Sequence, residues 1–203
     1  MLNSMSFSIF KCRLEITFSF VLIICSMIIL NDPINITWSI LAVFIHELGH
    51  IIYMCILHTP PDHITFTAFS IDISDKFSHT RNNTKNIFLA LAGPLANFIA
   101  TIIFYTLSII FNNTFYLPAA INLLIGCFNL LPIISLDGYQ IVHTILSTKF
   151  TPKTTCYITN CLSVIVLLPV LIFGFILEFR AKYNFSLLIV SLYLITALIL
   201  SRT

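Results

Sequence analysis

The stretch INITWSILAVFIHELGHIIYMCIL, residues 34–57, places the pentapeptide His46-Glu47-Leu48-Gly49-His50 inside an apolar segment long enough to cross a bilayer. On an α-helix, residues four apart share a face, so the imidazoles of His46 and His50 can bind one metal ion. Glu47 lies between them and can act on a metal-bound water. Ionisable side chains are costly inside a membrane, so this segment predicts a functional metal site.

The composition is typical of an integral membrane protein. Of 203 residues, 58% are hydrophobic and 9% are charged, and the mean hydropathy is +1.00. We predict an all-α polytopic membrane protein in one domain, residues 1–203, with both termini in the cytoplasm. About six transmembrane helices are expected, near residues 14–30, 34–57, 87–111, 117–146 with interruptions, 155–177 and 185–200. The first is taken as a retained helix because Asn31-Asp32-Pro33 is a poor signal-peptide cleavage site.

The distribution of Lys and Arg predicts the orientation. With a cytoplasmic N-terminus, Arg180 and Lys182 fall outside and the other eight of the ten basic residues fall inside. The eight are Lys11, Arg13, Lys76, Arg81, Lys85, Lys149, Lys153 and Arg202. The net charge of +2 then reflects topology, and no nucleic-acid partner is expected. Six cysteines without metal-ligand spacing (Cys12, Cys25, Cys55, Cys127, Cys156 and Cys161) are predicted to be free packing residues.

One long interruption, about residues 58–86, lies at or outside the membrane surface. It contains Pro60 and Pro61 and several charged residues. Apolar and polar residues alternate over Ile64–Thr67 and Phe69–Ile73, the period of a half-buried strand. We therefore predict a small membrane-associated β-hairpin between the second and third helices; the alternative is a disordered loop. The histidines of this region, His58, His63 and His79, are expected to be solvated.

The pentapeptide supplies two ligands, whereas a catalytic zinc usually takes three and keeps one position for water. Tyr53 and Ile56 occupy the positions where metzincins have a Gly and a third His, so the ligand must lie elsewhere. Asp137 is the acid between two apolar runs, where Pro132 breaks the helix before it and Gly138 permits a turn after it. On spacing alone, an ordinary Asp-Gly turn at a membrane boundary is an equal alternative. His143, six residues later, is expected near the membrane boundary, with the polar end of its side chain toward water.

Three separated motifs carry a family resemblance. His46-Glu47-Leu48-Gly49-His50, Gly93-Pro94-Leu95-Ala96-Asn97, and Asn129-Leu130-Leu131-Pro132 followed by Asp137-Gly138 occur in the order found in site-2 proteases. The chain resembles these intramembrane zinc metalloproteases, peptidase family M50, over about residues 14–200. The resemblance implies a catalytic core at about 34–146. It also implies one catalytic Zn²⁺ on His46, His50 and Asp137, with Glu47 as general base and Asn129 near the substrate carbonyl or oxyanion.

The resemblance is greatest to the compact sporulation-type branch, which implies regulated intramembrane proteolysis of a membrane-tethered precursor from the cytoplasmic side. It implies residence in the bilayer of a bacterial cell membrane, with a membrane regulatory partner possible. Members of this branch often carry a cytoplasmic nucleotide-sensing domain after the last helix, and none is expected in a chain that stops at Thr203. Two positions depart from the family pattern: Ala68-Phe69-Ser70 replaces a Gly-rich turn, and Tyr139 replaces a second Gly.

Two other functions compete with proteolysis. Some zinc transporters carry paired His and Glu on a membrane helix, but they have a Pro within the motif and a Glu after it, where this chain has Gly49 and Ile51. The other is a catalytically inactive protein that binds membrane helices. Such a protein would normally have lost a ligand or the base, and neither is lost here.

Overall fold

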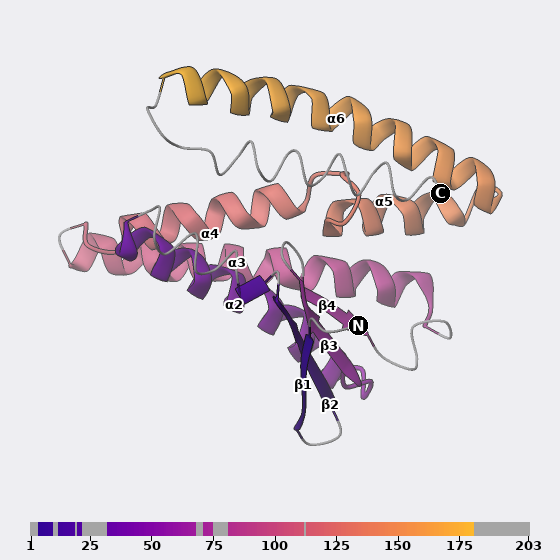
Figure 1. The fold of residues 1–203 in the computed structure, drawn as a ribbon, viewed down its shortest axis with the longest axis horizontal. Coiled ribbons are helices and arrows are strands. Elements are labelled where there is room, and N and C mark those ends of the chain that lie inside the picture. Colours follow the sequence, from indigo (N-terminus) through magenta and orange to yellow (C-terminus); the bar gives the residue numbers. More distant parts are fainter. Residues whose placement is uncertain are drawn as a thin grey trace. The chain divides into compact units, whose positions relative to one another are not determined.

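The computed structural model describes residues 4–9, 12–18, 20–21, 32–67, 71–74, 81–111 and 113–180 (Figure 1). The chain divides into two compact units, Met1–Phe128 and Asn129–Thr203, and each is described by itself. Among the described residues, the first unit contains a small sheet and the helices over 33–56, 83–110 and 116–129. The described part of the second unit contains the helices over 137–147 and 152–180.

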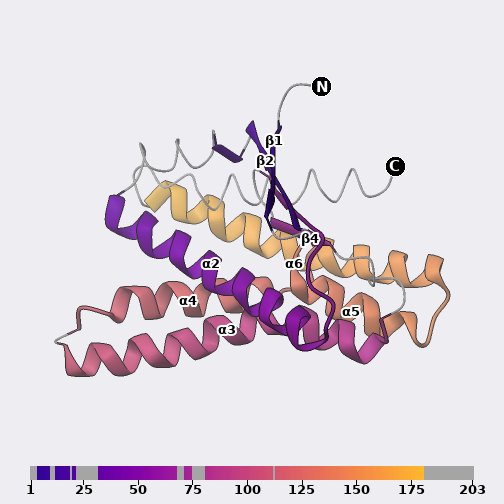
Figure 2. The same ribbon diagram turned by 90° about the horizontal axis from the view of Figure 1, so that it is seen from below.

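Helices α2, Pro33–Ile56, and α3, Asn83–Ile110, are apolar and long enough to cross a membrane. They confirm the second and third predicted spans, although α3 begins four residues before the predicted 87. Asp32 sets the start of α2: its Oδ1 accepts a hydrogen bond from the amide of Ile34 at 3.1 Å, and Pro33 occupies the first turn. The shorter α4, Tyr116–Asn129, follows α3 (Figure 2).

Small residues let α2 and α3 approach closely. A Cβ on Gly49 would collide with the carbonyl oxygen of Ala92 and would lie 2.8 Å from the Cβ of Ala96. In a membrane this packing replaces the hydrophobic effect as the force that holds helices together. Further along the two helices, the Trp38 ring meets that of Phe104 edge to face, with centroids 5.7 Å apart. The contact at Gly49 brings the pentapeptide against α3.

Four strands form one sheet in the order β1-β2-β3-β4: β1 is Ser4–Ile9, β2 Cys12–Thr17, β3 His63–Phe66 and β4 Ile71–Ser74. Strands β3 and β4 pair antiparallel, with Phe66 opposite Ile71, which confirms the predicted hairpin between the second and third helices. Strands β1 and β2 form a second antiparallel hairpin, and β2 joins β3 in parallel.

The N-terminal hairpin corrects the first predicted span. Residues 14–17 belong to β2, so a helix does not begin at Leu14, and the strand region is not confined to residues 58–86. The signal is present in the sequence, because Cys12, Leu14 and Ile16 alternate with polar residues at the period of a strand. Of the rest of that prediction, residues 18, 20 and 21 are helical, and residues 19 and 22–30 lie outside the described part of the chain.

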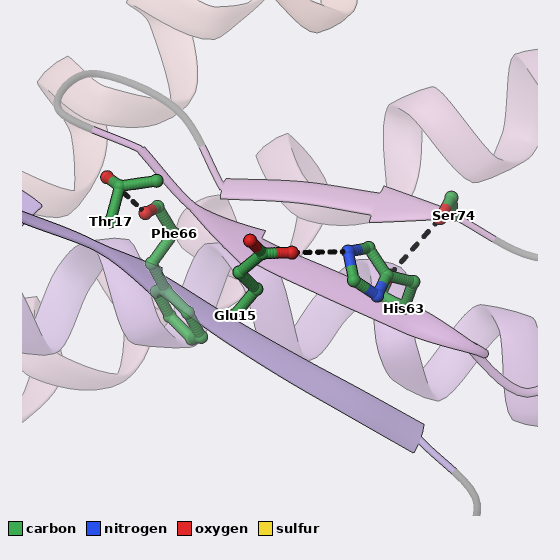
Figure 3. Close-up of polar contacts among 5 residues, drawn as sticks. All are labelled: Glu15, Thr17, His63, Phe66 and Ser74. Carbon is green, nitrogen blue, oxygen red and sulfur yellow. Dashed lines mark hydrogen bonds and ion pairs between the residues drawn. The ribbon is translucent and has the colours of Figure 1, made fainter. Parts of the chain in front are cut away.

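Side-chain contacts reinforce the parallel pairing of β2 and β3 (Figure 3). The Glu15 Oε2 lies 3.3 Å from the His63 Nε2, and the Thr17 hydroxyl donates to the Phe66 carbonyl at 2.8 Å. His63 is about one-third exposed beside this carboxylate. Burial, and after it the negative charge of Asp62, raises the pKa of the Cys12 thiol. All the cysteines except Cys25, which lies outside the described residues, carry free thiols.

The predicted fourth span resolves into two short helices. Helix α4 ends at Asn129, residues 130–136 are irregular, and α5 runs from Asp137 to Ser147. With 14 and 11 residues, neither helix reaches the roughly 20 residues that span a bilayer. Helix α6, Pro152–Arg180, has a membrane-length apolar stretch over 152–172 and begins three residues before the predicted fifth span. The predicted sixth span, 185–200, lies outside the described residues.

Replacing Gly49 with Ala should destabilise the first unit. The added methyl meets the Ala92 backbone, which cannot rotate away, so we expect a loss of about 1–3 kcal/mol in the free energy of unfolding. Unfolding in detergent micelles measures it. Gly126→Ala is the matched control, because its Cβ would meet the edge of the Phe98 ring at 2.9 Å, a side chain that can shift. Equal stability of the two variants would contradict the close packing at Gly49.

Candidate metal centre

The two histidines of the pentapeptide share the buried face of α2. His46 is 5% exposed and His50 is 9% exposed, and their Nε2 atoms lie 3.2 Å apart. Their rings meet edge to face with centroids 4.9 Å apart. The predicted sharing of one helical face is therefore observed, and it directs one nitrogen of each ring at the same small volume.

The other ring nitrogen of each histidine has a partner on α3. The Nδ1 of His50 lies 2.8 Å from the carbonyl oxygen of Leu89, and the Nδ1 of His46 lies 2.7 Å from the Oδ1 of Asn97. A carbonyl only accepts, so the Nδ1 of His50 carries the proton. Helix α3 thus fixes the orientation of both histidine rings of α2.

Asn97 is fully buried, and its neighbours determine how its amide is oriented. Its Nδ2 donates to the carbonyl of Ala42 at 2.9 Å and to the Oδ1 of Asn122 at 3.0 Å, which leaves its Oδ1 facing His46 as an acceptor. Asn122 is oriented in turn, because its own Nδ2 donates to the Pro118 carbonyl at 2.9 Å. The Nδ1 of His46 therefore also carries the proton.

In the neutral form of both rings, each Nε2 then presents a lone pair to the other. Two acceptors 3.2 Å apart repel, and a cation between them removes the repulsion. A tetrahedral zinc ion about 2.0–2.1 Å from each nitrogen requires a separation of about 3.3 Å between them. The neutral imidazoles with Nδ1–H are the form that ligates metal through Nε2. The two rings fit zinc as they stand.

Gly93 keeps the space beside these nitrogens open. A Cβ there would collide with the Nε2 of His50 and lie 2.7 Å from the Nε2 of His46, in the volume that both lone pairs address. The element Gly93-Pro94-Leu95-Ala96-Asn97 thus supplies both the open space and the acceptor for His46. In the sequence analysis this element served only as a motif of the family resemblance. The contributions of Asn122 and of the Leu89 carbonyl to the site were not predicted. The available signal was the presence of two asparagines, Asn97 and Asn122, within apolar helices, where polar side chains usually have a function.

The remaining predicted site residues lie on three elements. Glu47 follows His46 on α2 and is half-buried, and Asn129 is the last residue of α4. In the second unit, Asp137 is the first residue of α5 and is 8% exposed, directly after the irregular segment that contains Pro132. The predicted helix break before the acid is therefore present.

Comparison with known proteins points to one class, the membrane-embedded zinc metalloproteases. The sequence model of Peptidase family M50 matches residues 108–170, which include Asn129 and Asp137 but not the pentapeptide. A zinc metalloprotease of Methanocaldococcus jannaschii is 28% identical over 195 residues, 89% of this chain. The chain spans about half, 54%, of that relative's length.

The solved structure of a site-2 protease from the same organism has the same fold. It aligns with a TM-score of 0.70 and 25% identity, covering 96% of this chain and 93% of that one. All three comparisons support the resemblance to peptidase family M50 and the site-2 proteases. They do not distinguish the sporulation-type branch.

Replacing Asn97 with Leu should weaken zinc binding about 10–100-fold, because His46 loses the acceptor that holds its Nδ1 proton. Chelator competition on purified apo protein in detergent measures the affinity. Asn97→Asp is the matched comparison, since its carboxylate still accepts from His46, and it should bind zinc more tightly than Asn97→Leu. Wild-type affinity in Asn97→Leu would contradict the assigned tautomer.

Proposed function

We propose that this protein is an intramembrane zinc metalloprotease that hydrolyses a peptide bond in or near a transmembrane segment of a membrane-tethered precursor. The observation that carries this proposal is the pair of buried Nε2 atoms, 3.2 Å apart, within a helix of membrane-spanning length. The likeness to peptidase family M50 supports it.

His46, His50 and Asp137 would hold one catalytic Zn²⁺. Each of these side chains offers one ligand atom, and three protein ligands leave a position for water in a catalytic zinc site. The burial of Asp137 supports this role: it is the first residue of α5 and is 8% exposed, and a bound cation would offset the cost of burying its carboxylate. It also lies within the stretch that matches the family.

The bound zinc would supply a water of lowered pKa and polarise the scissile carbonyl. Glu47 follows a ligand on α2 and is half-buried; its carboxylate would accept the proton of that water and later deliver it to the leaving amine. The amide of Asn129, at the end of α4, would donate to the substrate carbonyl as negative charge develops on it.

A substrate helix must unwind before it can be cut. Unwinding in lipid leaves backbone groups unpaired at several kcal/mol each. Strand β4 is at one end of the described sheet, next to β3 alone. We propose that it accepts the extended substrate by strand addition and restores those hydrogen bonds.

Proline substitutions along β4, from Ile71 to Ser74, should impair cleavage at every second position, where the amide points away from β3. Cleavage of a tethered substrate in proteoliposomes measures the effect, and zinc content should stay at the wild-type value in each variant. Uniform impairment would indicate general damage to the sheet. Unaffected cleavage at all positions would rule out strand addition.

Finer assignments rest on charge and resemblance. The excess of Lys and Arg supports cytoplasmic termini and cleavage near the cytoplasmic face. The motifs support membership of the compact sporulation-type branch, in a bacterial cell membrane, with a regulatory membrane partner.

Glu47→Gln should lower the rate of cleavage about 10²–10⁴-fold because it removes the general base and leaves the proposed ligands in place. The measurement uses a tethered candidate substrate with wild type and variant in proteoliposomes, and both should hold equal zinc. Equal cleavage by the two proteins would exclude the enzymatic function in favour of a helix-binding protein. Zinc flux without proteolysis would support a transporter.

A further inference from the structure

The segment that leads into Asp137 is an irregular turn of the second unit. Between α4 and α5 the chain passes through residues 130–136, where Ser135 adopts a φ of +73°, a left-handed conformation that costs a non-glycine residue about 1 kcal/mol. Inside the turn, the amide of Leu136 donates to the carbonyl of Ile133 at 3.0 Å. A strained turn of this kind keeps one shape only when its surroundings hold it there.

Helix α6 contacts the turn on the N-terminal side of Asp137. The hydroxyl of Ser163, which is fully buried, donates to the carbonyl of Pro132 at 3.0 Å and also lies 2.9 Å from the carbonyl of Thr159 in its own helix. Because the helix is interrupted between α4 and α5, the Pro132 carbonyl makes no helical hydrogen bond. Its hydrogen-bond donor is Ser163, which lies 31 residues later in the sequence.

The same face of α6 contacts the chain on the C-terminal side of Asp137. The phenol of Tyr139 donates to the Oδ1 of Asn160 and accepts from the hydroxyl of Thr159, each at 3.3 Å. The Tyr139 ring also stacks on His143 one turn later, with centroids 5.8 Å apart and an interplanar angle of 25°. Residues 159, 160 and 163 lie within about one helical turn, so one side of α6 reaches both flanks of the acid.

From these contacts we infer that α6 positions Asp137 for metal binding, with Thr159, Asn160 and Ser163 holding the turn at Pro132 and at Tyr139. This inference rests on the proposed function, in which Asp137 is the third zinc ligand. Helix α5 has 11 residues, too few to be stable alone, so its first residue takes its position from tertiary contacts. Tyr139 and Ser163 are positioning residues and touch neither zinc nor substrate in this account.

The test measures zinc affinity, by chelator competition on the full chain in detergent, for Tyr139→Phe, Ser163→Ala and the two combined. Each change removes only a hydroxyl. The combined variant should bind zinc about tenfold more weakly than wild type, the lower end of the effect of losing contacts around a ligand. Tyr157→Phe, at an exposed position of α6, and Ser108→Ala, at a buried position of α3, are the matched controls and should keep wild-type affinity.

A background of Asp137→Asn separates positioning from general destabilisation. There the combined variant should cause no further loss of affinity, because the ligand it positions is gone. Unchanged affinity in the combined variant, or the same loss with and without Asp137, would overturn the positioning role. If Asp137→Asn alone leaves zinc affinity at the wild-type value, the third-ligand assignment in the proposed function fails instead.

Discussion

The hydrogen bonds that hold the Nδ1 protons of His46 and His50 determine what the rest of the structure must provide. With the Nδ1 proton held on both neutral rings, the Nε2 lone pairs face one another at 3.2 Å, an arrangement that a cation between them stabilises. The acceptors for those protons come from α3, so α3 must lie directly against α2. Gly49 permits that contact. Gly93 has no side chain, so α3 does not fill the space beside the two Nε2 atoms where a metal ion would bind.

Polar groups inside these apolar helices form one connected chain of hydrogen bonds. It runs from the Pro118 carbonyl through Asn122 and Asn97 to His46, and every amide in it is buried. In lipid, an isolated amide would be costly, and a saturated chain removes that cost while leaving one orientation for each side chain. Helix α4 therefore acts on the metal site through the orientation of Asn97.

The sequence predicted the features that depend on local pattern. The length of apolar runs located α2, α3 and α6, and alternation located the hairpin of β3 and β4. The same alternation at Cys12–Thr17 was missed because a long apolar run follows it and suggested a helix from Leu14. The hydrogen-bond partner of His46 was also not predicted. No local sequence pattern shows that Asn97 faces His46, because that contact depends on how α2 and α3 pack. The roles of Glu47, Asn129 and Asp137 stay predictions.

The parallel pairing of β2 with β3 constrains the topology of the chain. Backbone hydrogen bonds join residues 13–16 to residues 63–66, and a hydrogen-bonded sheet cannot be divided by a bilayer. The N-terminal hairpin, the end of α2 and the hairpin that precedes α3 therefore share one side of the membrane. Arg13 and Arg81 are then on the same side for a reason independent of their charge, so finding the side of either one orients the whole first unit.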